Sequence, residues 1–83
     1  KLILAADRII LARVLIQKAR DLPIPTDGGK YNFSYIAQVK DYLRQARDLV
    51  KLIPFMPGAT AEIKDAAREV LIEADQANKE ILH

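Results

Sequence analysis

Apolar residues in the first 22 positions recur on several sides of a helix. The main set steps 4-3-4-3 along one helical face and consists of Ala5, Ile9, Ala12, Ile16 and Ala19. A second set lies beside the first and consists of Leu4, Leu11, Leu15 and Leu22. A third set lies well around the helix and consists of Ile3, Ile10 and Val14. Since such a helix must be covered from several directions, this segment is either the central element of the fold or half of an oligomer contact.

Two later segments each carry a single apolar face. A second helix is expected over about 33–52, beginning near Asn32 or Ser34, either of which can cap a helix N-terminus. Its apolar face consists of Tyr35, Ile36, Val39, Tyr42, Leu43, Ala46, Leu49, Val50 and Ile53. A third helix is expected over about 60–82, with Thr60 as its cap. Its apolar face consists of Ile63, Ala67, Val70, Ala74, Ala77 and Ile81.

Prolines and glycines divide the chain between these segments. They gather in residues 22–29 and 54–58, where they end the preceding helices, so the first helix is expected over about 2–21. No window alternates with the period of a strand for long. Short connections between helices of similar length favour antiparallel neighbours. We therefore predict an all-α single domain over 1–83, an up-down-up three-helix bundle that dimerisation or a neighbouring domain would complete.

This fold has a definite expected core. One apolar residue pair from each helix should be buried together, namely Ile9, Ile16, Val39, Leu43, Val70 and Ala74. Three apolar residues in the connections should close the two ends of the bundle, namely Ile24, Phe55 and Met56. A chain of 83 residues without cysteine buries a modest core and has no disulfide. Stability must therefore come from helix packing, from a partner, or from both.

The charge of the chain is small but unevenly distributed. The formal net charge is +2, which is too low to indicate a nucleic-acid binder or a polybasic membrane anchor. Residues 1–57 hold 10 basic and 5 acidic side chains, a net +5, whereas residues 58–83 hold 3 and 6, a net −3. The two parts of the chain therefore differ in sign.

The apolar N-terminal segment does not fit a signal peptide or a membrane span. Four charged residues interrupt it, namely Asp7, Arg8, Arg13 and Lys18. The absence of cysteine fits the cytosol and cysteine-free exported domains alike. The sequence does not determine the compartment; the cytoplasm is favoured over an exported mature form. Because the first residue is Lys1 and not Met, the chain fits a processed product or a fragment of a longer protein.

Catalytic and metal-binding chemistry has little support in the sequence. Nucleophilic catalysis needs an activated nucleophile beside a base, but the chain offers only Ser34 at a helix start and His83 at its end. Residues 28–30, Gly-Gly-Lys, lack the spacing of a phosphate-binding loop and indicate a turn. Four carboxylates share one stripe of the third helix without a histidine, which indicates a solvated face: Glu62, Asp65, Glu69 and Glu73. We expect no enzyme activity, cofactor, metal or small-molecule substrate.

Two surfaces remain as candidates for partner binding. The first is the stripe of Ile3, Ile10 and Val14, three apolar residues on one side of a helix that a lone bundle leaves wet. The second is a basic stripe on the second helix, which consists of Lys40, Arg44, Arg47 and Lys51. This basic stripe is a solvated surface, a docking face for an acidic partner, or a contact for nucleic-acid backbone.

The favoured interpretation is a non-catalytic helical module for protein–protein interaction, such as an adaptor domain or a subunit that oligomerises. Its partner is expected to be another protein or a second copy of the chain, through the face that carries Ile10 and Val14. The alternative is an accessory nucleic-acid-binding domain that uses the basic stripe, which the low net charge makes the less favoured interpretation.

Overall fold

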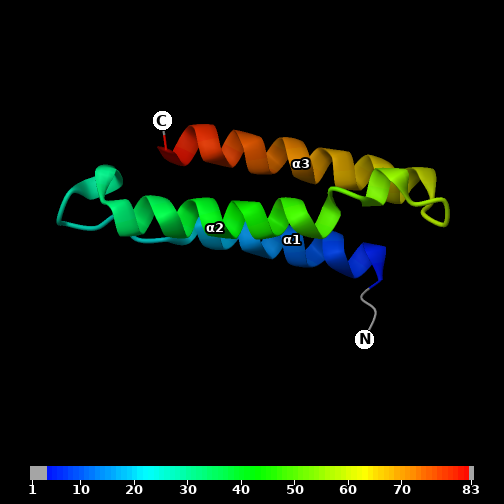
Figure 1. Cartoon of the computed structure of the whole chain (residues 1–83), viewed down its shortest axis with the longest axis horizontal. Helices are drawn as coiled ribbons and strands as arrows, with labels where there is room; N and C mark the ends of the chain where they lie inside the picture. The colour runs from blue at the N-terminus through cyan, green and yellow to red at the C-terminus, as the bar shows by residue number, and fades with distance from the viewer. Residues whose placement is uncertain (1–3, 83) are drawn as a thin grey trace.

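The computed structural model describes residues 4–82 and shows three α-helices packed side by side (Figure 1). The elements in chain order are α1 (Ala5–Asp21), the 3-10 turn η1 (Gly29–Tyr31), α2 (Phe33–Val50), the 3-10 turn η2 (Ile53–Phe55) and α3 (Ala61–Leu82). α2 runs opposite to α1 and α3, and every helix contacts the other two. The described residues include no strand. The predicted all-α, up-down-up three-helix bundle is confirmed.

Side-chain caps fix the starts of α2 and α3. Of the two residues that could cap α2, Asn32 does so: its Oδ1 accepts a hydrogen bond from the Tyr35 amide at 3.1 Å, whereas Ser34 lies inside the helix. The Thr60 Oγ1 accepts from the Ile63 amide, also at 3.1 Å. Each bond satisfies an amide that has no partner within its own helix. Local sequence therefore determines where these two helices begin.

Three helix ends match the expected ones, at Asp21, Phe33 and Leu82, and the other three differ. α2 ends at Val50 and not at residue 52. Pro54 has no amide hydrogen to donate to the Val50 carbonyl, and the chain forms η2 from Ile53 instead. α3 starts at Ala61, directly after its cap. α1 begins at Ala5 and not earlier, because Leu4 is extended and precedes the helix as its N-cap, without a side-chain hydrogen bond; residue 2 itself lies outside the described residues.

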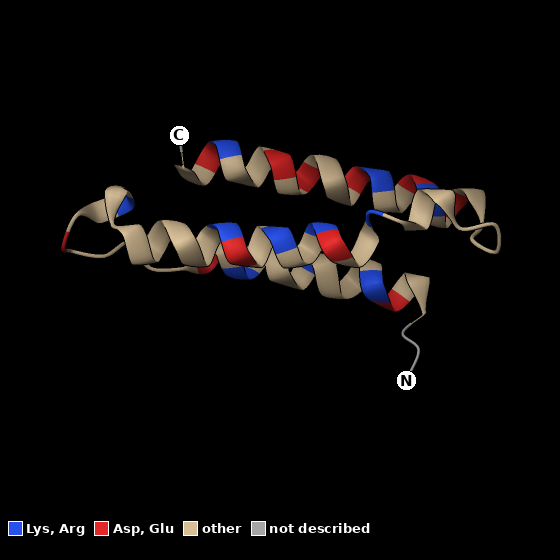
Figure 2. Cartoon of the chain, viewed as in Figure 1, with Lys and Arg blue, Asp and Glu red and all other residues tan. Residues whose placement is uncertain are grey.

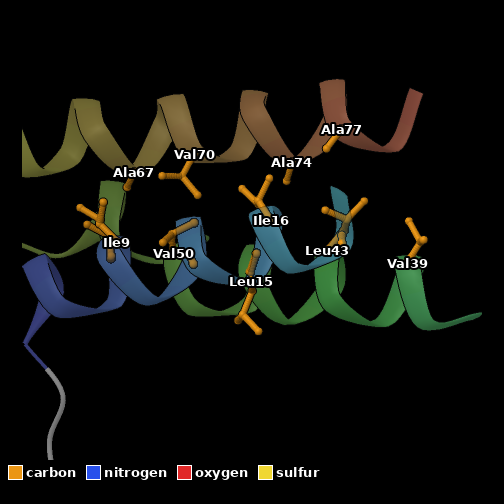
Figure 3. Close-up of a cluster of buried hydrophobic side chains, with 14 of the residues drawn as sticks. Ile9, Leu15, Ile16, Val39, Leu43, Val50, Ala67, Val70, Ala74 and Ala77 are labelled. Atoms are coloured by element: carbon orange, nitrogen blue, oxygen red, sulfur yellow. The ribbon is translucent and has the colours of Figure 1, made fainter. Parts of the chain in front are cut away.

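The core is one cluster built from the apolar faces of all three helices. The six residues expected to be buried together all belong to it: Ile9, Ile16, Val39, Leu43, Val70 and Ala74. Their side chains point toward one another between the helices (Figure 3). Alanines at 0% exposure line α1 and α3, namely Ala12, Ala19, Ala67, Ala74 and Ala77. No polar or charged residue within residues 4–82 is buried.

The connection between α1 and α2 depends on a glycine. Gly28 has φ +82°, and a Cβ built there would lie 3.4 Å from the Asn32 Cα. Its carbonyl oxygen accepts a hydrogen bond from the Tyr31 amide at 3.1 Å, which opens η1. A residue with a side chain rarely adopts this left-handed conformation. Residues 28–30 therefore form a turn, and the carbonyl groups of Gly28 and Gly29 accept hydrogen bonds within it.

The expected closure of the bundle ends by Ile24, Phe55 and Met56 is wrong. All three side chains are exposed, and Phe55 is 81% exposed. Ile53 is buried instead, at 1% exposure. The reason is the 3-10 turn η2, in which residues two apart point in different directions, so that burying Ile53 turns Phe55 outward.

Candidate interaction surfaces

The N-terminal half of α1 carries an exposed apolar surface. Ile10 is 63% exposed and Val14 is 44% exposed, while Ile3 lies outside the described residues. Leu4 is 70% exposed and Leu11 is 41% exposed. Here we call Leu4, Ile10, Leu11 and Val14 the α1 apolar face. Ile10, Leu11 and Val14 lie close together on α1, and Leu4 lies about two turns before Leu11 with Asp7 between them.

Leu4 and Leu11 were not among the residues expected on this surface. The sequence groups them with Leu15, which is 9% exposed and belongs to the core. Leu15 follows Leu11 by four residues, which is about 40° more than one full turn of the helix. This difference places Leu15 in the core and leaves Leu11 outside it. The broad apolar arc of this helix indicated in the sequence that some of its leucines would be exposed. Only the packing of the three helices shows which ones.

Ion pairs join α1 to α3 on another flank of α1. The Arg13 guanidinium donates to both carboxylate oxygens of Glu73, at 3.2 and 3.1 Å, and lies 3.7 Å from Glu69. The bond to Glu73 raises the pKa of Arg13 above its ordinary value. Nearer the C-terminus, Arg20 Nη1 lies 2.6 Å from Glu80 Oε1. These contacts use two members of the acidic stripe of α3, so that part of the stripe serves helix packing.

Carboxylates of α2 lie beside the basic stripe and pair with two of its members. Arg44 donates to Asp41 at 2.5 Å and to Asp48 at 3.4 Å, and Lys51 lies 3.2 Å from Asp48. The hydrogen bond from Arg44 and, to a smaller extent, the one from Gln45 lower the pKa of Asp41 below its ordinary value. Figure 2 shows acidic residues beside the basic ones along α2. Arg44 and Lys51 are therefore engaged locally.

An open groove of about 410 Å³ lies between α2 and α3. It is lined by Ala37, Lys40, Asp41, Arg44, Arg47, Asp75 and Asn78. Lys40 and Arg47 form no ion pair with another residue of the described chain, whereas Asp75 pairs with Lys79 at 3.1 Å. The groove thus presents two available cations among mixed charges.

Other candidate chemistry is sparse in the part of the chain that the structure covers. No group of three or more histidine, cysteine or acidic side chains within residues 4–82 could hold a metal ion. Ser34 is exposed in the first turn of α2, and His83 lies outside the described residues. None of the helices within residues 4–82 is long and apolar enough to cross a membrane. Comparison with protein-family models, curated proteins and solved structures found no match to the chain.

Proposed function

We propose that this protein is a non-catalytic helical module that works by protein–protein contact, and that the α1 apolar face is the contact. The occupant we propose is a second copy of the chain, which makes the protein an assembly module. The supporting observation is the exposure of Ile10 and Val14, together with Leu4 and Leu11, on the side of α1 that faces away from α2 and α3.

Physical chemistry favours covering this face. Burial of apolar surface is worth about 25 cal/mol per Å², so each large side chain moved out of water contributes measurably to association. Isolated exposed apolar residues are ordinary, but several of them gathered on one side of a helix are typical of an interface. α2 and α3 differ from α1 in this respect, because most of their large apolar side chains lie in or against the core.

The direct test replaces Ile10 with Glu and Val14 with Lys in one chain. Sedimentation should show that the parent protein associates and that this double variant is a monomer, while circular dichroism shows that both remain helical. The matched control is Ile72→Glu, because Ile72 is also exposed but lies on α3. This control should associate like the parent. If the double variant unfolds, these residues belong to the core and the proposal is wrong.

The alternative function, accessory nucleic-acid binding, has one supporting observation: Lys40 and Arg47 flank an open groove without ion-pair partners in residues 4–82. The local pairing of Arg44 and Lys51 leaves few cations for phosphate. Binding of a labelled oligonucleotide that weakens steeply with salt and is lost in Lys40→Glu with Arg47→Glu would favour this alternative. If the parent protein binds no oligonucleotide even at low salt, the nucleic-acid-binding alternative is excluded.

A further inference from the structure

One line of residues along α1 is exposed from end to end. Its members step 3-4-3-4-3 and are Leu4, Asp7, Leu11, Val14, Lys18 and Asp21, all of them exposed. We call this line the outer seam. The 3-4 spacing is that of the two core positions of a coiled-coil heptad, so the outer seam lies on one side of the helix. It lies away from the buried line of Ala5 to Ala19.

The charges on the outer seam are arranged symmetrically about its middle. Asp7 precedes Leu11 by four residues, and Lys18 follows Val14 by four. If two copies of α1 lie antiparallel about the midpoint between Leu11 and Val14, each Asp7 faces Lys18 of the second copy. Parallel helices would instead bring Asp7 against Asp7 and Lys18 against Lys18. Opposite charges across an interface fix its register, and like charges oppose it.

Neither charge is used within the described chain. Asp7 and Lys18 are exposed and form no ion pair with another residue of 4–82. The neighbouring basic residues Arg13 and Arg20, in contrast, are turned toward carboxylates of α3. Arg13 and Arg20 thus hold the bundle together, whereas Lys18 faces outward on the outer seam.

We infer that two copies of this protein pack through α1 as an antiparallel twofold dimer, with Leu11 against Val14 at the centre and an Asp7–Lys18 ion pair on each side. This inference rests on the proposed function and names its partner and register. A twofold axis repeats every contact, so one charge pair becomes two. Ile10 borders the seam and adds to its apolar centre, while Leu4 reaches the rim beside Asp21 of the second copy.

The size of the seam makes this a reversible dimer. A helix of 17 residues is about 25 Å long at 1.5 Å per residue. A contact along one such helix buries less than the roughly 800 Å² per partner of a standard interface. Association should therefore depend on protein concentration, and its strength should respond to single charge changes.

The test reverses each charge separately. In the Asp7→Lys dimer the introduced lysine faces Lys18 of the second copy, and this repulsion occurs twice. In the Lys18→Asp dimer the introduced aspartate faces Asp7 of the second copy, again twice. Each variant alone should dimerise at least about tenfold more weakly than the parent. The reason is that two exposed ion pairs, each of the usual strength, are lost and replaced by like charges. In 1 M salt the Asp7→Lys defect should be partly relieved, because screening acts over about 3 Å.

Mixing the two variants should restore association as a 1:1 heterodimer. In that heterodimer the introduced lysine of one chain faces the introduced aspartate of the other. The second contact joins the unchanged Lys18 of the first chain to the unchanged Asp7 of the second. Both contacts therefore pair opposite charges, as in the parent dimer.

The controls make the same charge changes elsewhere. Asp27→Lys lies in the connection after α1 and Lys40→Asp lies on α2, and both should associate like the parent. Carrying both seam reversals, Asp7→Lys and Lys18→Asp, on one chain should also restore the homodimer. This chain has the least favourable charges for the dipole of α1, so its recovery cannot come from a better folded helix.

The outcomes separate this inference from the proposed function. Unchanged dimerisation of the single variants, or a mixture that fails to form a heterodimer, overturns the antiparallel register. If the Ile10 and Val14 substitutions still dissociate the parent dimer, the α1 apolar face keeps its proposed function. A parent protein that stays monomeric at high concentration overturns both.

Discussion

The side chain of Leu43 is fully buried at the centre of the α2 face that meets α1 and α3. Replacing it with alanine removes apolar contacts from the core and leaves a cavity, which typically costs about 2–5 kcal/mol. We expect Leu43→Ala to lower the free energy of unfolding by that amount in urea denaturation. Leu52→Ala, an exposed leucine two residues past the end of α2, should change it by less than about 0.5 kcal/mol. Equal effects of the two substitutions would contradict the assignment of the core.

Asp41 should respond to acid differently from an isolated carboxyl. Its pKa is lowered from an ordinary value of 3.8, first by the hydrogen bond from Arg44 and then by that from Gln45. A lowered pKa means that the pair stabilises the folded state above the ordinary value, and that this contribution is lost as the pH falls through the lowered pKa. NMR titration should place the Asp41 pKa below 3.8 in the parent and move it upward in Arg44→Ala. Gln45→Ala should produce a smaller rise, and an Arg44→Ala chain with an unchanged Asp41 pKa would show that the pair does not form in solution.

Residue-scale features that depend on near neighbours were predictable. Thr60 was expected as a cap, and Asn32 as one of two candidates beside Ser34, because a capping bond spans only three residues. The outward position of Phe55 was not predictable from apolarity alone, because it follows from the 3-10 turn that contains Pro54. A cap is a local property, whereas the direction of a connection side chain depends on the path of the backbone.

At the scale of elements, the contact between α1 and α3 combines small buried residues with ion pairs at its edge. Arg13 and Glu73 are 43% and 39% exposed in their side chains, so their coupling should be modest, about 0.2–1 kcal/mol. A double-mutant cycle with Arg13→Ala and Glu73→Ala, measured by urea denaturation, should give that value. The same cycle between Arg13 and Glu62, which are not paired, should give a coupling near zero. A zero coupling for Arg13 and Glu73 would contradict a stabilising ion pair between them.

Helical periodicity identified the elements but not their neighbours. The 4-3 spacing from Ala5 to Ala19 marks the side of α1 that is buried. It does not say whether α3 lies on the flank of Arg13 or on that of Leu15, because both hands of a three-helix bundle bury the same seam. The ion pairs of Arg13 and Arg20, each with a residue 60 positions away, place α3 on the arginine flank. Such pairs require the packing register, which a single sequence does not contain.

At the scale of the whole molecule, the apolar content of α1 exceeds what two neighbouring helices cover. The sequence predicted this excess through Ile10 and Val14, and the structure adds Leu4 and Leu11 to the same exposed face. The spacing of Asp7 and Lys18 on the outer seam is already symmetric in the sequence, and the structure adds that both side chains are exposed and form no ion pair within residues 4–82. The exposed apolar side chains of α1 thus support association, and the charges on its outer seam support the antiparallel alignment of two copies.

Sedimentation equilibrium of the parent protein over a wide range of concentration tests self-association through α1 most directly. The chain has a mass of 9.3 kDa, and we predict a reversible transition from that mass to twice that mass as the concentration rises. The transition should be absent in the chain with Ile10→Glu and Val14→Lys. A single species of 9.3 kDa at every concentration would contradict self-association through α1.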